Sequence, residues 1–111
     1  MAKYEKTLNG NLHSFLNYFG SEIENSLSVT LEESSDYKIG GVTCAVRIYE
    51  RYSWSGGNRV SLSLTVVGDT NTFRVIVTAS GGSQAMFFKL NTLGEENFLS
   101  LAEQIIDSYS D

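Results

Sequence analysis

The sequence contains no proline and a single cysteine among its 111 residues. One cysteine cannot form a disulfide within the chain, which excludes a disulfide-stabilised scaffold. Basic residues are also few, with 8 Lys and Arg against 13 Asp and Glu, so the formal net charge is -5 at pH 7. This balance argues against generic nucleic-acid binding, which needs a surface rich in Lys and Arg.

Long apolar runs are absent as well. No segment approaches the roughly 20 consecutive apolar residues that cross a bilayer, and no apolar signal-peptide core follows the charged first residues. We therefore expect a cytoplasmic protein that does not engage a membrane. Cys44 alternates with polar or small neighbours on the same side as Val42, Val46 and Ile48, which predicts a buried, inert thiol.

Apolar and aromatic residues are plentiful, at 41% and 12% of the chain. Such a composition argues against disorder and is sufficient for one hydrophobic core. No linker or repeat divides the sequence, so we expect a single domain over residues 1–111.

The apolar spacing predicts the order of the elements. Residues 4–8 alternate as a short strand, and the stripe from Leu12 to Ile23 is typical of an amphipathic helix. Four further strands with period two are expected at residues 27–32, 42–49, 59–66 and 72–79, with a polar loop at 32–38. Residues 85–90 could form a last short strand. Thr92 and Glu95 form a capping box that predicts a C-terminal helix.

These elements predict a two-layer α+β fold. An antiparallel sheet of four to six strands carries an N-terminal and a C-terminal helix on one face, in the order β-α-β-β-β-β-(β)-α. The other face is expected to be exposed or covered by a partner.

Arginines dominate the polar side of the predicted strands. The alternation places Arg47, Arg51, Arg59 and Arg74 on one sheet face, together with Tyr49. Arginine forks match carboxylates and phosphates, so this face is a candidate site for an anionic small molecule. The alternative is an ordinary solvated face in which the arginines pair across strands or stack on Tyr49.

The hairpin around residues 49–59 concentrates aromatic and charged side chains. Glu50 shares the side of Val46 and Ile48 and is expected to point toward the core. It is either a general base or ligand anchor, or a member of a salt bridge or capping contact. Trp54 is either an exposed interaction anchor or a lid over the end of the core. Gly81, Gly82 and Ser83 resemble a backbone phosphate loop, or a bend between strands.

Motifs for catalysis or metal binding are missing. His13 is the only histidine and is expected on the helix surface, and a lone histidine makes a metal site improbable. No nucleophile motif selects a serine. We expect neither a metal nor a cofactor.

Three strings resemble a family of short, uncharacterised bacterial proteins, classed as a domain of unknown function. They are residues 44–52 (CAVRIYERY), 56–62 (GGNRVSL) and 81–89 (GGSQAMFFK). The resemblance covers nearly the whole chain and implies a bacterial, cytoplasmic domain, but no activity, cofactor or partner. The element order is also loosely similar in shape to helix-grip domains, which is an analogy without functional content.

Three functions follow as expectations. The first is a non-catalytic module that binds a small molecule or a protein. The second is a homo-oligomer that associates through the exposed sheet face or an edge strand. The third is a small enzyme that uses Glu50 with Arg51 or Arg59.

Overall fold

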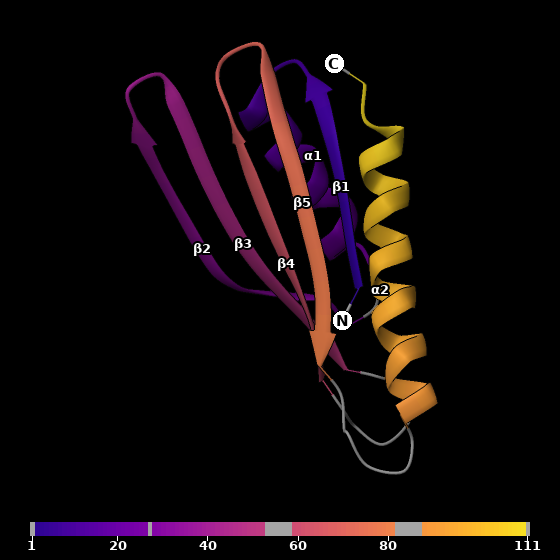
Figure 1. The fold of residues 1–111 in the computed structure, drawn as a ribbon. Helices are drawn as coiled ribbons and strands as arrows, with labels where there is room; N and C mark the ends of the chain where they lie inside the picture. The colour runs from indigo at the N-terminus through magenta and orange to yellow at the C-terminus, as the bar shows by residue number, and fades with distance from the viewer. Residues whose placement is uncertain (1, 27, 53–58, 82–87, 111) are drawn as a thin grey trace.

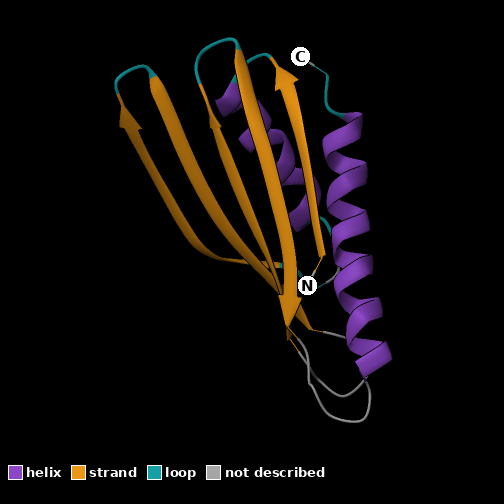
Figure 2. Cartoon of the chain, in the orientation of Figure 1, coloured by secondary structure: helices purple, strands orange, loops and turns teal. Residues whose placement is uncertain are grey.

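A computed structural model describes residues 2–26, 28–52, 59–81 and 88–110, with side chains described except at 52 and 88–97. The elements are β1 (Ala2–Asn9), α1 (Leu12–Glu24), β2 (Thr30–Ile39), β3 (Val42–Tyr52), β4 (Arg59–Gly68), β5 (Thr72–Gly81) and α2 (Phe88–Ser108). The five strands form one antiparallel sheet, and both helices pack on one face of it (Figure 2). The predicted α+β fold is confirmed.

The strand order is β1-β5-β4-β3-β2, so β1 and β2 form the two edges of the sheet. The chain reaches β2 from β1 through α1, which crosses the same face that α2 covers (Figure 1). Beyond α1 the strands follow one another through hairpins, as the short turns in the sequence require. The second face of the sheet carries no element of the described chain.

The core lies between this sheet and the two helices. Period-two alternation in β4 and β5 directs one side of each strand inward, and α1 contributes the stripe that the sequence predicts. The side chains that are fully enclosed include Phe15, Phe19, Leu62, Leu64, Phe73 and Phe98. Phe15 packs against Phe73 with ring centroids 5.3 Å apart, and such aromatic contacts add to the stability that burial provides.

The side chains of strand β3 face the sides of the sheet opposite to those predicted. Ala45 and Tyr49 are buried, at 0% and 2% exposure, whereas Val42 is 46% exposed. The register explains this, because Ala45 and Tyr49 pair with Val66 and Leu62, whose side chains point to the helices. The prediction that Cys44 is a buried thiol is wrong, since it lies on the outer side and is partly exposed.

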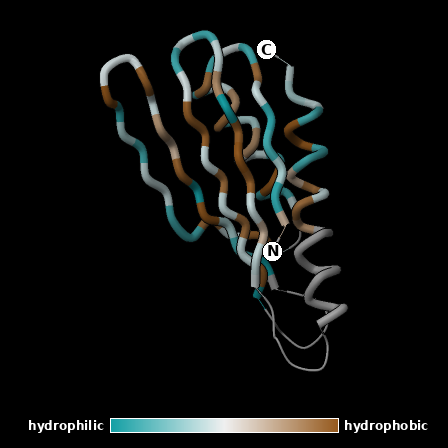
Figure 3. Tube along the Cα trace, viewed as in Figure 1, coloured by the Kyte–Doolittle hydropathy of each residue, from teal (hydrophilic) through white to brown (hydrophobic). Residues whose placement is uncertain are grey.

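Strand β2 includes the segment predicted as a loop. Residues 32–38 all lie within β2, and every residue of the strand is exposed. An edge strand that neither helix covers has no buried face, so it lacks the apolar alternation that identifies other strands. Figure 3 shows the hydrophilic colour of most of this segment. The turn that follows is Gly40–Gly41, where Gly40 has a φ of 61° that favours glycine.

Helix α2 begins before the predicted capping box. It starts at Phe88, so Thr92 and Glu95 lie inside the helix, and residues 88–90 are helical rather than part of a last strand. The remainder of that predicted strand lies outside the described residues. The apolar stripe of the C-terminal half, which includes Phe98, Ala102 and Ile106, is buried as predicted.

Candidate functional site

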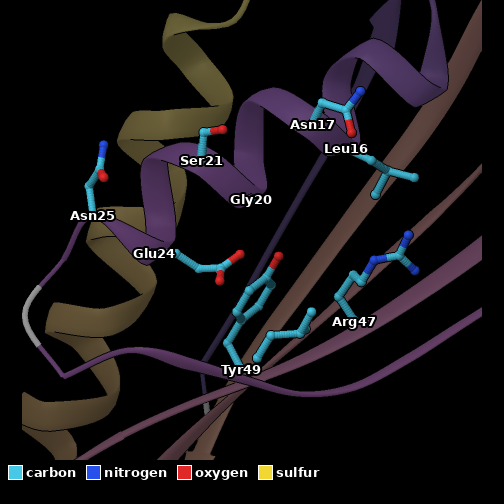
Figure 4. A pocket seen from close by; sticks show the side chains of 9 residues that line it. Leu16, Asn17, Gly20, Ser21, Glu24, Asn25, Arg47 and Tyr49 are labelled. Atoms are coloured by element: carbon cyan, nitrogen blue, oxygen red, sulfur yellow. The ribbon is translucent and has the colours of Figure 1, made fainter.

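An open groove runs between α1 and the adjoining strands β2 and β3. Its cavity volume is about 480 Å³. Helix α1 supplies one wall, and Arg47 and Tyr49 lie across from it (Figure 4). Leu31 of β2 also lines the groove. The complete lining is Leu16, Asn17, Gly20, Ser21, Glu24, Asn25, Leu31, Arg47 and Tyr49.

Tyr49 forms the floor of the groove. Its ring packs against Phe19 with centroids 5.8 Å apart, and its hydroxyl points toward α1 (Figure 4). Burial and the negative charge of Glu24 raise the pKa of Tyr49, Arg47 partly opposes them, and the resulting pKa is about 12. The Tyr49 hydroxyl therefore stays protonated at neutral pH and responds to both neighbouring charges.

Gly20 leaves space on the helical wall above this hydroxyl. A Cβ placed at Gly20 would lie 3.6 Å from both Glu24 Oε2 and the Tyr49 hydroxyl oxygen. These are ordinary van der Waals distances. The side chain that glycine omits would point into the groove between the two polar groups.

Arg47 lies on the other side of Tyr49 from Glu24 (Figure 4). Its Nη1 donates to Asp36 Oδ1 at 2.6 Å and to the Val46 carbonyl at 3.0 Å, and Nη2 donates to Asp36 Oδ2 at 3.2 Å. The hydrogen bond from Arg47 holds the pKa of Asp36 below its usual value. Within the described residues, these contacts leave the Nε–H group of Arg47 for another acceptor.

The predicted four-arginine face does not form. Arg47 and Arg51 alternate with the outer residues of β3 and face the helices, and the Arg51 guanidinium lies 4.7 Å from the centre of the Phe98 ring. Desolvation lowers the pKa of Arg51. Arg59 and Arg74 lie on the outer face, as predicted. The error in β3 follows from its register with β4, described above.

Both outer arginines take part in ion pairs within the chain. Arg74 donates to Thr7 Oγ1 at 2.7 Å and to Glu5 Oε1 at 3.2 Å. Arg59 forms ion pairs with Glu50 and, at 3.8 Å, with Glu32. The pairing of arginines across strands, one of the two interpretations of the sequence, is thus observed at these positions.

Glu50 points away from the core, contrary to prediction. It lies on the outer face, where it pairs with Arg59 and accepts a hydrogen bond from Ser61 Oγ at 3.2 Å. The salt-bridge interpretation of Glu50 is therefore confirmed. Of the two pairs expected for an enzyme, Glu50 with Arg59 is present. Arg51 lies on the opposite side of the sheet, so the described residues do not assemble the Glu50–Arg51 pair.

The glycine-rich candidate is only partly described. Gly81 is the last residue of β5 and has a φ of 121°. A Cβ there would lie 2.7 Å from the Arg59 carbonyl oxygen, so the close approach of β4 favours glycine. Gly82, Ser83 and Trp54 lie outside the described residues.

Apart from Arg47 and Tyr49, the residues that line the groove were not site candidates in the sequence analysis: Leu16, Asn17, Gly20, Ser21, Glu24, Asn25 and Leu31. The interior helical position of Gly20 was the one available signal, since glycine costs helix stability there. His13 is exposed, as predicted. Among the described residues, no group of His, Cys, Asp and Glu is arranged to hold a metal ion. No described helix is long and apolar enough to cross a membrane.

Nearly the whole chain matches a protein family. A family of unknown function, DUF6054, covers residues 1–110, and the chain belongs to it. No curated protein and no solved structure matches the chain. The match confirms the predicted resemblance to a family of unknown function.

Proposed function

We propose that this family member is a non-catalytic binding module, and that the groove between α1 and the sheet takes a small polar molecule. The observation that carries the proposal is the placement of the Glu24 carboxylate on one side of the buried Tyr49 and the Arg47 guanidinium, with its remaining Nε–H donor, on the other (Figure 4). A compact site with a few convergent polar groups and a titratable residue of perturbed pKa is typical of ligand sites.

The charges favour a molecule that carries both an amine and a carboxylate. Asp36 already neutralises Arg47, and Glu24 adds a negative charge. A purely anionic ligand, the expectation from the sequence, would meet a net negative groove. An ammonium group near Glu24 and a carboxylate near the Arg47 Nε–H satisfy both sides.

The walls fit the body of such a molecule. Leu16 and Leu31 supply apolar surface, and Leu31 is 41% exposed. Asn17, Ser21 and Asn25 supply hydrogen-bonding groups along the helix. A short aliphatic chain between the two charged ends could contact the leucines while its ends reach the polar groups. We propose a bacterial cytoplasmic setting, supported by the single cysteine and the family resemblance.

The test uses γ-aminobutyrate as the probe, with butylamine and butyrate as comparators that carry one charge each. In an NMR titration, we expect γ-aminobutyrate to shift the amide signals of residues 20–25 and 47–49 more than either comparator. Glu24→Gln should weaken the binding of γ-aminobutyrate and of butylamine but leave the binding of butyrate unchanged.

Two matched variants distinguish a loss of binding caused by a filled groove from a loss caused by unfolding of the protein. Gly20→Leu places a neutral side chain in the groove and should abolish the shifts, whereas Ser14→Leu alters an exposed position of the same helix outside the groove and should preserve them. Equal shifts in all variants, or shifts scattered away from the groove, would contradict the proposal.

A further inference from the structure

The outer face of the sheet has a regular pattern of side chains. This outer face is defined by the residues that alternate with the buried ones on the central strands: Cys44, Val46, Ile48, Ser61, Ser63, Thr65, Val67, Arg74, Ile76 and Thr78. The registers align them in rows across all five strands. One row reads Ser35, Val46, Thr65, Ile76 and Glu5, and the next reads Glu33, Ile48, Ser63, Thr78 and Lys3.

The middle of this face combines apolar and small side chains. Val46 and Ile48 on β3 and Ile76 on β5 are partly exposed, and they flank Ser63 and Thr65 on β4. Small hydroxyl residues at the centre let a second flat surface approach closely. Apolar residues gathered on an uncovered sheet face are characteristic of a contact surface.

Charge is distributed unevenly between the two edges. The second row begins with Glu33 on β2 and ends with Lys3 on β1. The arginines elsewhere on the face have acidic partners within the chain, Arg74 with Glu5 and Arg59 with Glu50. Lys3 shares the Glu5 carboxylate with Arg74, at 3.0 and 3.2 Å, so these three residues keep one net positive charge beside the β1 edge. Covering the face would therefore leave neither arginine without a partner, and this positive edge and the negative Glu33 select the orientation of whatever covers it.

We propose that a second copy of the chain covers this face, outer face against outer face, to give a four-layer α/β/β/α dimer. The two-fold axis runs along β4. Rotation about that axis brings Glu33 of each copy opposite Lys3 of the other, and Val46 opposite Ile76. A contact of this kind is isologous, as most homodimer interfaces are.

The size of the face is sufficient for such a contact. Five strands about 4.8 Å apart, with four same-face positions along each strand, cover about 600 Å² per copy. The total of about 1,200 Å² exceeds the roughly 1,000 Å² expected of a biological interface. Two sheets that pack face to face in this way keep their strands roughly aligned.

The first test is the mass of the full chain in solution by sedimentation velocity. The dimer has twice the chain mass of 12.3 kDa. Val46→Asp places a carboxylate against Ile76 of the other copy and should weaken the dimer at least about 100-fold. Leu31→Asp makes the same kind of change on the helix side of the sheet and should leave the dimer intact.

A charge exchange tests the orientation. Lys3→Glu and Glu33→Lys should each weaken the dimer by about 3- to 10-fold, and the double variant should restore it. The reaction rate of Cys44 with a thiol reagent should also fall as protein concentration rises, because Cys44 lies on the covered face. A monomer at about 1 mM, equal loss in Leu31→Asp, or no rescue by the double variant would overturn the proposal.

Discussion

Replacing Gly20 by alanine should stabilise the protein while it narrows the groove. Gly20 is interior to α1, where alanine is favoured over glycine by about 1 kcal/mol. The new methyl group would lie 3.6 Å from both Glu24 Oε2 and the Tyr49 hydroxyl oxygen, so no steric strain offsets this gain. Glu24 is exposed, and partial coverage of its carboxylate costs little.

The expected gain can be converted to a melting temperature. An unfolding entropy of about 2.1 cal/mol/K per residue makes 1 kcal/mol equivalent to a rise in Tm of about 4 °C for a chain of this length. Thermal unfolding at pH 7, followed by circular dichroism and by urea titration, measures the change. The Gly20→Ala variant should also bind γ-aminobutyrate more weakly in the NMR titration. A lower Tm would refute the reasoning, because it would place the surrounding atoms closer to Gly20 than described.

Three other predictions concern backbone packing and titration. Gly68→Ala should destabilise the fold by about 1 to 3 kcal/mol, since its Cβ would lie 2.3 Å from the Thr72 carbonyl oxygen; Gly41→Ala, with nothing within 4 Å, should be nearly neutral, and urea unfolding compares the two. Glu24→Gln should lower the pKa of Tyr49 from about 12, as measured by tyrosinate absorbance. An unchanged pKa would show that the charge of Glu24 does not act on Tyr49. Asp107 has a lowered pKa because Tyr4 and Lys6 donate hydrogen bonds to it. Its contribution to stability is therefore present above its unfolded pKa and is lost as the pH falls through its folded pKa. In acid unfolding, Asp107→Asn should make the stability depend less steeply on pH in this range.

The parts of the fold with one buried face were predictable from sequence. In β4 and β5, and along α1, apolar residues occupy the inward side. The other side of the two strands is mostly polar, with Val67 and Ile76 as its apolar members. Burial imposes the period of the element on the sequence, so the pattern can be read back. Where no face is buried, as in β2, the sequence carries no such pattern. The prediction of a loop there failed for this reason.

Strand β3 failed for a different reason: both of its sides carry apolar groups. Val46 and Ile48 suggested one inner side, while Ala45 and Tyr49 form the real one. Only the pairing with β4 decides between them, and pairing is a tertiary property. For the same reason, Arg47, Arg51 and Glu50 were predicted on the wrong face of the sheet. The sequence made Tyr49 and Arg47 binding candidates on the outer face, whereas the structure places both in the groove. The groove residues on α1 could not be identified without knowing that α1 crosses the sheet.

The most direct test of the central claim is the NMR titration of the chain with γ-aminobutyrate, compared between the unaltered protein and Gly20→Leu. We expect amide shifts concentrated at residues 20–25 and 47–49 in the unaltered protein. In the variant these shifts should be lost, while the remaining signals stay those of a folded protein. Shifts that persist in folded Gly20→Leu, or that never appear at these residues, would contradict the central claim.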